Sequence, residues 1–237
     1  MNIALLGYGK MGKTIEKIAK ERLHQIVLIK DETPAKEELE NIDVAIDFSF
    51  PESAFENIKI CLENHIKVIS GTTGWLEKYD EAVKLCKKNQ GSFLYASNFS
   101  VGVNIFFQLN QLLAKMMASH HEYQVEMEEI HHTQKLDAPS GTAITLANGI
   151  IKNTTYSDWY LKGTPPKENA IPIQDKRVGI VPGTHLIHYY SDIDSIEIKH
   201  TAHKREGFAL GAVIAAEWLQ DKTGVYDMSD VLDLKKM

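Results

Sequence analysis

The chain has 237 residues, of which 43% are hydrophobic and 24% charged, and its net charge is -6. This composition is typical of a folded globular protein and excludes a disordered, collagen-like or coiled-coil chain. Because the chain has no strong basic field, we expect neither nucleic acid nor a membrane surface as a partner. Two cysteines cannot form a disulfide framework, and no apolar stretch matches a signal peptide or a membrane span. We therefore expect a cytoplasmic protein.

The first hundred residues alternate short apolar runs with helical patterns. Strands rich in Val, Ile, Leu and Phe are predicted at residues 2–6, 24–29, 43–48, 67–70 and 92–96. Helices are predicted between them at residues 10–20, 55–65 and 76–89. Alternating strands and helices, with strands that are apolar almost throughout, predict a parallel sheet built from βαβ units.

The pattern changes after residue 99. Residues 100–118 predict one long apolar helix, and residues 122–132 predict a half-buried strand by strict alternation. That alternation slips near Glu129 and Ile130, which indicates a bulge or a change of face. A mixed or antiparallel sheet, a long Pro- and Gly-rich loop and a last helix are expected downstream, with strands at 177–181, 184–191 and 194–202, the loop at 161–174 and the helix at 205–219.

A glycine cluster follows the first predicted strand. Gly7, Gly9 and Gly12 spell G-x-G-x-x-G, a pattern that brings a helix N-terminus and exposed backbone to a pyrophosphate. Asp31 lies 19 residues after Gly12, at the end of the second predicted strand, where an acid that binds a ribose is expected. This spacing favours a dinucleotide.

The same segment has a second interpretation. Residues 7–14 also satisfy the P-loop pattern G-x-x-x-x-G-K-T, in which Lys13 would bind phosphates and Asp47 would hold magnesium. A P-loop ATPase or kinase therefore stays open as an alternative. A third possibility is that the glycines only form a turn.

Small and hydroxyl-bearing residues follow the later predicted strands. They are Phe48-Ser49, Gly71-Thr72-Thr73-Gly74 and Ala96-Ser97-Asn98-Phe99. Ligands of open parallel sheets bind beyond the carboxyl ends of the strands, so these segments suit a cofactor that lies across that edge. Gly, Thr, Ser and Asn are also ordinary turn residues, and each segment alone allows that interpretation.

The densest group of reactive side chains lies between residues 129 and 142. Ser140, Gly141 and Thr142 follow Pro139 and precede a helical pattern, which would place free backbone N–H groups at a helix N-terminus and create an anion site. Ser140 alone is equally explained as an N-cap. His131 and Lys135 are candidate proton donors beside that anion. Neighbouring histidines on a strand point to opposite faces, so no metal site is expected.

The segment Glu129-x-His131-His132-x-x-Lys135-x-Asp137-Ala138-Pro139-Ser140-Gly141-Thr142 resembles the signature of the 4-hydroxy-tetrahydrodipicolinate reductase (dihydrodipicolinate reductase) family. GYGKMG, DVAIDFS, GTTG, SNFSVGVN and HTAHKREGFALGAVIAAEWL extend the resemblance over almost the whole chain. The central signature is long and specific, whereas the glycine pattern is shared by many proteins.

The resemblance implies a specific role for each of the candidate site residues. His131 and Lys135 would be the proton donors, and the substrate carboxylates would be held by His132, Ser140, Gly141 and Thr142. The cofactor would lie along three groups of residues: Gly7, Tyr8, Gly9, Lys10, Met11 and Gly12; Lys30 and Asp31; and Phe48, Gly71, Thr72, Thr73, Ala96, Ser97, Asn98 and Phe99.

The fold implied is α/β, with a Rossmann-type dinucleotide domain at residues 1–98 and 208–237. A smaller α+β domain at 99–207 would bind substrate and form a homotetramer. The reaction implied is hydride transfer from NADH or NADPH to a cyclic dicarboxylate imine, with loss of water, in the diaminopimelate route to lysine. Compared with the family the chain is short around residues 30–43, and Asp31 favours NADH or use of both cofactors. A non-catalytic dinucleotide sensor remains a further alternative.

Overall fold

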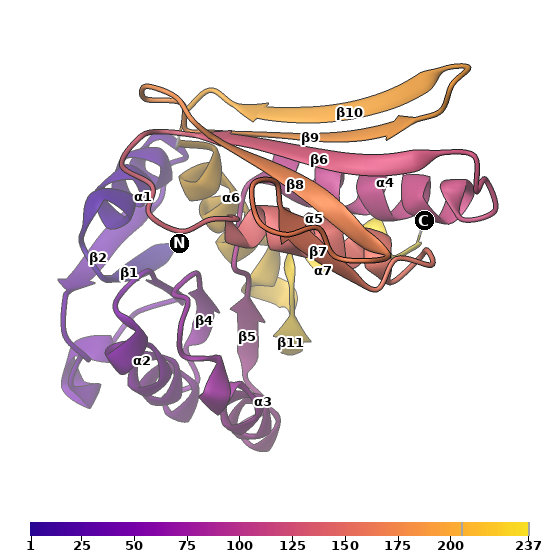
Figure 1. Ribbon diagram of the computed structural model, residues 1–237. Coiled ribbons are helices and arrows are strands. Elements are labelled where there is room, and N and C mark those ends of the chain that lie inside the picture. The colour runs from indigo at the N-terminus through magenta and orange to yellow at the C-terminus, as the bar shows by residue number, and fades with distance from the viewer. Residues whose placement is uncertain (205, 237) are drawn as a thin grey trace. The chain divides into compact units, whose positions relative to one another are not determined.

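The computed structural model describes residues 1–204 and 206–236. The chain forms two compact units, one of Met1–Val101 with Glu206–Met237 and the other of Gly102–Arg205. Each unit has its own sheet and its own hydrophobic core, labelled by element in Figure 1.

The first unit contains a six-stranded sheet in which every pairing is parallel. Its spatial order is β11-β5-β4-β3-β1-β2. β2 therefore lies on one side of β1, and all later strands lie on the other side. The predicted parallel sheet is confirmed, and only the three-residue β11 has no counterpart in the prediction. The strands are β1 (Asn2–Leu6), β2 (Gln25–Lys30), β3 (Val44–Asp47), β4 (Lys67–Ser70), β5 (Ser92–Tyr95) and β11 (Gly224–Tyr226).

Helices cover both faces of this sheet. Ile3 and Leu5 pack with α1 (Lys10–Glu21) and α6 (Glu206–Trp218), while Ala4 and Leu6 pack with α2 (Pro51–Glu63) and α3 (Tyr79–Lys88). Successive side chains of a strand point to opposite faces, so burial of both faces explains the continuous apolar runs. Short helical segments complete the unit: η1 (Lys36–Leu39), η2 (Leu76–Lys78), η3 (Leu219–Asp221), α7 (Met228–Val231) and η4 (Leu234–Lys236).

The second unit is built on a five-stranded mixed sheet in the order β10-β9-β6-β8-β7. β6 pairs antiparallel with β9 and parallel with β8. α4 (Val101–Met117) and α5 (Gly141–Ile151) pack on one face, as Figure 1 shows, and among the described residues no helix covers the other face, which we call the uncovered face. The strands are β6 (Gln124–His131), β7 (Asp158–Leu161), β8 (Ala170–Arg177), β9 (Gly183–Tyr190) and β10 (Ser195–Ala202).

Three details of the sequence prediction are wrong in this unit. No bulge or change of face occurs in β6, because its pairing with β9 is continuous. The side chains of Glu129 and His131 lie on the same buried face, which the helices cover, as the other buried residues of the strand. The predicted loop at 161–174 ends in β8, because Ile171 and Ile173 are buried in the core and burial outweighs the local Pro and Gly content. The predicted strand at 177–181 retains only Arg177.

The remaining residues of that predicted strand form the turn between β8 and β9. Gly179 adopts a φ of +49° and the side chain of Ile180 is 94% exposed, so the apolar run has no sheet partner there. Within the described part of the chain, no helix is long and apolar enough to cross a lipid bilayer.

Candidate active site

The glycine loop joins β1 to α1, and its three glycines have different surroundings. Gly7 adopts a φ of +94°, and a Cβ there would lie 2.2 Å from the carbonyl oxygen of Phe48. A Cβ on Gly12 would lie 2.3 Å from the carbonyl oxygen of Gly7, whereas a Cβ on Gly9 would meet no atom within 4 Å. A tight turn, an open approach and close packing are the features of a pyrophosphate-binding loop.

Geometry argues against the P-loop alternative. Lys13 and Thr14 lie within α1, which already begins at Lys10, so the loop is too short to wrap a triphosphate. The Thr14 hydroxyl donates to the Lys10 carbonyl at 2.9 Å, an intrahelical bond. The Lys13 ammonium lies 5.6 Å from the centre of the Tyr8 ring, a cation–π contact.

Asp47, the magnesium ligand of that alternative, is fully buried. Burial raises the pKa of its carboxyl, while four hydrogen bonds act in the opposite direction. The donors are Ser49 at 2.6 Å, Asn57 at 3.0 Å, and Ser70 and Thr72 at 2.8 Å each. Asp47 therefore ties together the loops that follow β3 and β4, a role that sequence reasoning missed because its pattern also fits a metal-binding strand.

The end of β2 brings an acidic group next to the glycine loop. Asp31 Oδ1 accepts a hydrogen bond from the backbone N–H of Tyr8 at 2.6 Å. Lys30 pairs with Glu38 of η1 at 2.7 Å, and this hydrogen bond raises the pKa of the Lys30 ammonium. The lysine charge is thus matched by a carboxylate, and the Asp31 side chain lies beside the loop.

The loops after β4 and β5 present a mixture of exposed and buried residues. Thr73 and Ser97 are exposed, whereas Thr72 points inward to Asp47. Phe99 is 1% exposed, and its ring lies 5.6 Å from that of Phe48. Thr73, Ser97 and the exposed backbone are accordingly the groups that can contact a ligand. The rings of Phe48 and Phe99 pack against each other beneath these loops.

In the second unit, the end of β6 and the middle of β9 form a buried polar cluster. Glu129 is completely buried, and its Oε2 lies 3.4 Å from His131 Nδ1 and 3.5 Å from His185 Nε2. The residues His131 and His185 are 6% and 5% exposed, and their imidazole rings meet edge to face, with centroids 5.1 Å apart. The sequence indicated His131 but assigned no role to Glu129 or His185, which come together only through β-sheet pairing.

Ser140 links this cluster to the start of α5. Its backbone N–H donates to Glu129 Oε1 at 2.8 Å, and its hydroxyl donates to Glu129 Oε2. The same hydroxyl accepts from Ala143 N at 3.1 Å, which makes Ser140 the N-cap of the helix. Gly141 is exposed and Thr142 half-exposed. The first turn of α5 therefore offers its N–H groups next to the cluster.

The loop between β6 and α5 is braced by Arg177, which sequence reasoning also missed. Arg177 donates to the backbone carbonyls of Lys135 at 3.1 Å and Asp137 at 2.7 Å, and it pairs with Asp175. The Lys135 ammonium contacts both carboxylate oxygens of Asp137 at 2.9 Å. His132 is half-buried at the start of this loop.

Burial and neighbouring charges set the protonation of the cluster. Hydrogen bonds from His185 and Ser140 outweigh desolvation and lower the pKa of Glu129 to about 2. Desolvation, reinforced by His185, Lys135 and Arg177, lowers the pKa of His131 to about 4, although Glu129 acts in the opposite direction. His131 is therefore neutral near pH 7.

Glu129, His131 and His185 also have the spacing of metal ligands. Their ligand atoms lie within 4.8 Å of one another. Ser140, however, donates hydrogen bonds to both oxygens of the Glu129 carboxylate. Glu129 is therefore held in a polar network with Ser140 and the two imidazoles.

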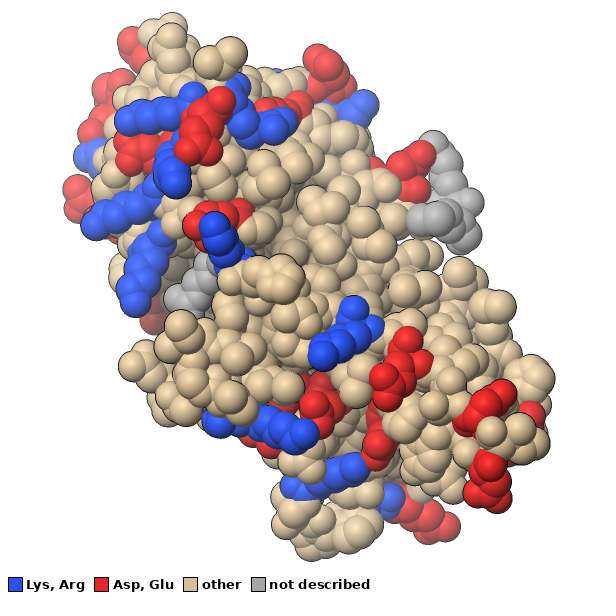
Figure 2. Space-filling model, turned by 90° about the horizontal axis from the view of Figure 1, so that it is seen from above, with Lys and Arg blue, Asp and Glu red and all other residues tan. Residues whose placement is uncertain are grey.

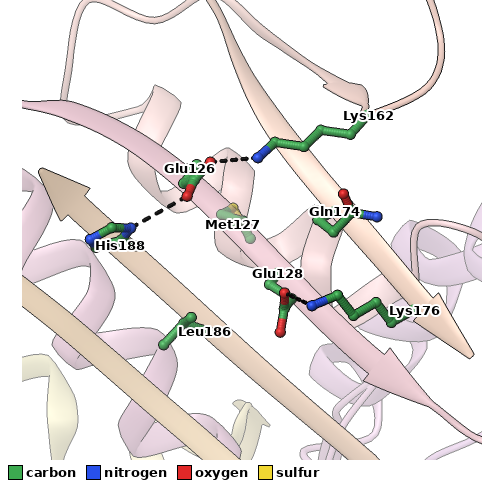
Figure 3. A pocket seen from close by; sticks show the side chains of 8 residues that line it. All are labelled: Glu126, Met127, Glu128, Lys162, Gln174, Lys176, Leu186 and His188. Atoms are coloured by element: carbon green, nitrogen blue, oxygen red, sulfur yellow. Dashed lines mark hydrogen bonds and ion pairs between the residues drawn. The ribbon is translucent and has the colours of Figure 1, made fainter. Parts of the chain in front are cut away.

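The uncovered face of the second sheet has a different character. A pocket of about 180 Å³ lies there between β6, β8 and β9, and Figure 3 shows Glu126 directed toward both Lys162 and His188. Glu128 pairs with Lys176 beside it. None of the candidate catalytic residues lines this pocket, so it is separate from the cluster around His131.

Charged side chains on the surface are mixed in sign. On the face of the molecule that Figure 2 shows, Lys and Arg lie among Asp and Glu, with a broad area that carries neither. That face has no concentrated basic field of the kind that phosphate backbones require.

A doubly wound parallel sheet with a pyrophosphate-type glycine loop and an acid after its second strand defines the class of NAD(P)-dependent oxidoreductases. Comparison with known proteins supplies the family. The model of the dihydrodipicolinate reductase N-terminus matches residues 1–99, and that of the C-terminus matches residues 102–232. The chain belongs to the dihydrodipicolinate reductase family and is an NAD(P)H-dependent reductase.

Individual relatives agree with this assignment. The chain is 57% identical over 235 residues to the 4-hydroxy-tetrahydrodipicolinate reductase of Christiangramia forsetii, covering 98% of each chain. Its fold is similar to dipicolinate-bound dihydrodipicolinate reductase from Paenisporosarcina sp. TG-14, with a TM-score of 0.78, 23% identity and coverage of 97% and 99%. Aspartate dehydrogenase of Thermotoga maritima shares the fold more distantly, with a TM-score of 0.53, 12% identity and coverage of 94% and 97%.

Proposed function

We propose that the chain reduces 4-hydroxy-tetrahydrodipicolinate to tetrahydrodipicolinate with loss of water, in the diaminopimelate route to lysine. The observation that supports this best is the cluster at the N-terminus of α5, where a buried imidazole adjoins the helix end that attracts anions. An imidazole next to an anion site is well placed to donate a proton to the ring of a bound dicarboxylate. The cytoplasm, where nicotinamide cofactors and this pathway's substrates are made, is the expected location.

In this proposal one unit binds the cofactor and the other binds the substrate. The unit of Met1–Val101 and Glu206–Met237 would bind the dinucleotide: Gly9 would hold the pyrophosphate, Asp31 the ribose, and Thr73 and Ser97 the nicotinamide end. The unit of Gly102–Arg205 binds the substrate. When bound, NADH or NADPH supplies the hydride that reduces the ring of the substrate.

The substrate carboxylates are assigned to the N–H groups of Gly141 and Thr142, together with His132 and the ammonium of Lys135. The positive end of the α5 dipole favours negative charge at this place. Ser140 uses both its N–H and its hydroxyl within the protein, so it supports the helix end and does not contact the substrate. A substrate carboxylate that replaces Asp137 as the partner of Lys135 keeps that charge paired.

His131 is assigned the proton that the substrate ring receives next to the reduced carbon. The pKa of His131 is about 4 in the free protein, so the ring must gain its proton once substrate is present. Two carboxylates bound close by favour the imidazolium form and raise this pKa. The substrate dianion therefore helps to charge its own proton donor.

Binding of pyridine-2,6-dicarboxylate is expected to be accompanied by proton uptake. Because the dianion raises the pKa of His131 from about 4, the uptake grows as the pH falls from about 8 to about 6, and affinity rises in the same direction. Titration calorimetry in buffers of different ionisation enthalpy measures the proton count directly. A His131→Gln variant that still takes up the same number of protons would assign the uptake to another group.

Asp31→Asn is expected to shift cofactor preference toward NADPH by roughly tenfold. Asparagine keeps the oxygen that accepts from Tyr8 N but removes the charge that would repel a 2′-phosphate, and about 1.4 kcal/mol corresponds to tenfold. Titrating NADH and NADPH by the quenching of protein fluorescence gives both dissociation constants. Equal changes for the two cofactors would show that Asp31 does not discriminate between them.

The activity itself is tested by nicotinamide absorbance at 340 nm. Substrate is generated in the cuvette by a synthase acting on pyruvate and aspartate semialdehyde, with NADH and NADPH run in parallel. Substrate-dependent loss of absorbance supports the reductase. Binding of NADH without turnover would favour a dinucleotide sensor instead, and binding of Mg-ATP would revive the P-loop alternative.

We further propose that the protein is a homotetramer assembled through the uncovered face of the second sheet. That face carries complementary charges, with Glu126 next to Lys162 and Glu128 next to Lys176, and the pocket of Figure 3 lies among them. Light scattering after gel filtration measures the assembly state. A monomeric mass at micromolar concentration would reject the proposal.

A further inference from the structure

We propose that Glu129 is a positioning residue for His131, acting as the buried counter-ion that orients the imidazole and stabilises its protonated form, with Ser140 and His185 holding the carboxylate in place. This inference rests on the proposed role of His131 as the proton donor. It adds three side chains to the site, contributed by β6, β9 and the N-cap of α5.

The carboxylate is held from several directions. Ser140 donates its N–H to one oxygen and its hydroxyl to the other, and His185 Nε2 lies 3.5 Å from Oε2 and 3.3 Å from the Ser140 hydroxyl oxygen. A fully buried carboxylate is costly unless such donors satisfy it. The network therefore fixes a negative charge at one point next to His131.

Geometry assigns a different task to each nitrogen of His131. Nδ1 faces Glu129 Oε2 at 3.4 Å, whereas Nε2 lies on the side of Gly183, where a Cβ would come within 3.2 Å of it. A carboxylate next to Nδ1 favours the tautomer with its hydrogen on that atom. Nε2 is then the atom that takes up a proton and passes it to the substrate.

The His131–Glu129 contact is close in distance but poorly aligned in this structure. Nδ1 of His131 is buried and makes no hydrogen bond, although the carboxylate oxygen is 3.4 Å away. A neutral ring gains little from that contact, whereas an imidazolium gains a charge-assisted hydrogen bond. The carboxylate thus interacts more strongly with the state of His131 that the reaction needs.

Other charged groups face the cluster and must be counted. Lys135 and Arg177 disfavour a positive His131, and His185 adds to this effect. Asp175, which is paired in register with Glu129 on β8, forms an ion pair with Arg177. Burial nevertheless raises the pKa of its carboxyl, and the neighbouring Glu129 adds to this rise. Glu129 is the group that opposes all of these, because it favours the protonated ring.

The test compares Glu129→Gln with wild type over the full pH range. Glutamine keeps the size of the side chain but removes its charge, so the pKa of His131 in the substrate complex should fall. The limb of the kcat profile at alkaline pH then moves to lower pH, and kcat near neutral pH drops about 10- to 100-fold, as is usual for residues that support a functional side chain. KM for NADH stays unchanged, because the dinucleotide is assigned to the other unit.

Two further variants separate positioning from folding. Glu129→Asp keeps the charge and should restore the wild-type pH limb with partial kcat, and Glu122→Gln removes an exposed carboxylate of the same unit as a matched control. If Glu129→Gln lowers kcat but leaves the alkaline limb of the kcat–pH profile at its wild-type pH, Glu129 has only a structural role. Loss of wild-type activity on chelation, with recovery on adding Zn²⁺, would overturn the proposal in favour of a metal site.

A readout without turnover keeps this test independent of the proposed reaction. Long-range ¹H–¹⁵N NMR of histidine-labelled wild-type protein distinguishes the two neutral tautomers. We expect hydrogen on Nδ1 of His131; hydrogen on Nε2 would reject the positioning role. If the wild-type protein shows this tautomer but oxidises no NADH or NADPH with substrate, the proposed function fails and the geometry of the cluster stands.

Discussion

Replacement of His131 by glutamine is expected to lower kcat by about 10²–10⁴-fold, the range in which a general acid typically contributes. The affinity for NADH should be nearly unchanged, because His131 lies in the second unit, at the end of β6. Stopped-flow reduction with saturating cofactor measures the rate, and fluorescence quenching measures NADH binding. Glutamine is chosen because it is polar and similar in length, so the buried position is neither emptied nor charged.

The matched control for this variant is His120→Gln, at an exposed histidine of the same unit whose partner is Glu122. Circular dichroism of both variants checks that the fold is retained. Turnover of the His131 variant equal to that of the control would remove His131 from the proposed chemistry. A loss of NADH affinity equal to the loss of rate would mean that the substitution disturbs the whole protein.

Gly9→Val is expected to weaken NADH binding roughly 10- to 100-fold, since overpacking costs about 1–3 kcal/mol and 1.4 kcal/mol corresponds to tenfold. A Cβ at Gly9 meets nothing within 4 Å, and its φ of -72° is accessible to valine. The new side chain therefore fills only the space assigned to the pyrophosphate. The melting temperature should stay close to that of wild type, apart from a small effect at the helix N-cap.

Gly12→Val provides the contrast. A Cβ at this position would lie 2.3 Å from the carbonyl oxygen of Gly7, so this variant should lose both fold stability and cofactor binding. Scanning calorimetry and NADH titration of the two variants separate a ligand effect from a folding effect. A Gly9→Val protein that binds NADH like wild type would place the pyrophosphate elsewhere.

Much of the first unit could be predicted from local patterns. Buried parallel strands such as Val44–Asp47 are apolar on both faces, and glycines at positions of unusual backbone geometry cannot be replaced, so both leave clear traces in the sequence. β11 was missed because a three-residue strand is too short to show any periodicity. The parallel sheet and its cofactor loop therefore follow from short-range physical constraints.

The second unit was harder because polar residues occupy positions facing its core. Glu129 broke the expected alternation and suggested a bulge, yet the strand continues because Ser140 and His185 satisfy the carboxylate. Ile171 and Ile173 form a strand within a segment rich in Pro and Gly, because the core of this unit buries them. In both places long-range contacts outweighed the local signal.

By itself, the sequence determined the family, the parallel sheet and the glycine loop, because these are properties of neighbouring residues, and it named His131 and Lys135 as candidate proton donors. Tertiary structure alone decided that Asp47 is a buried hydrogen-bond acceptor and that the Ser140 hydroxyl donates to the buried Glu129. It alone joined Glu129, His131 and His185 into one network. The reason is physical: strand pairing brings together side chains more than fifty residues apart, and burial then sets their charge.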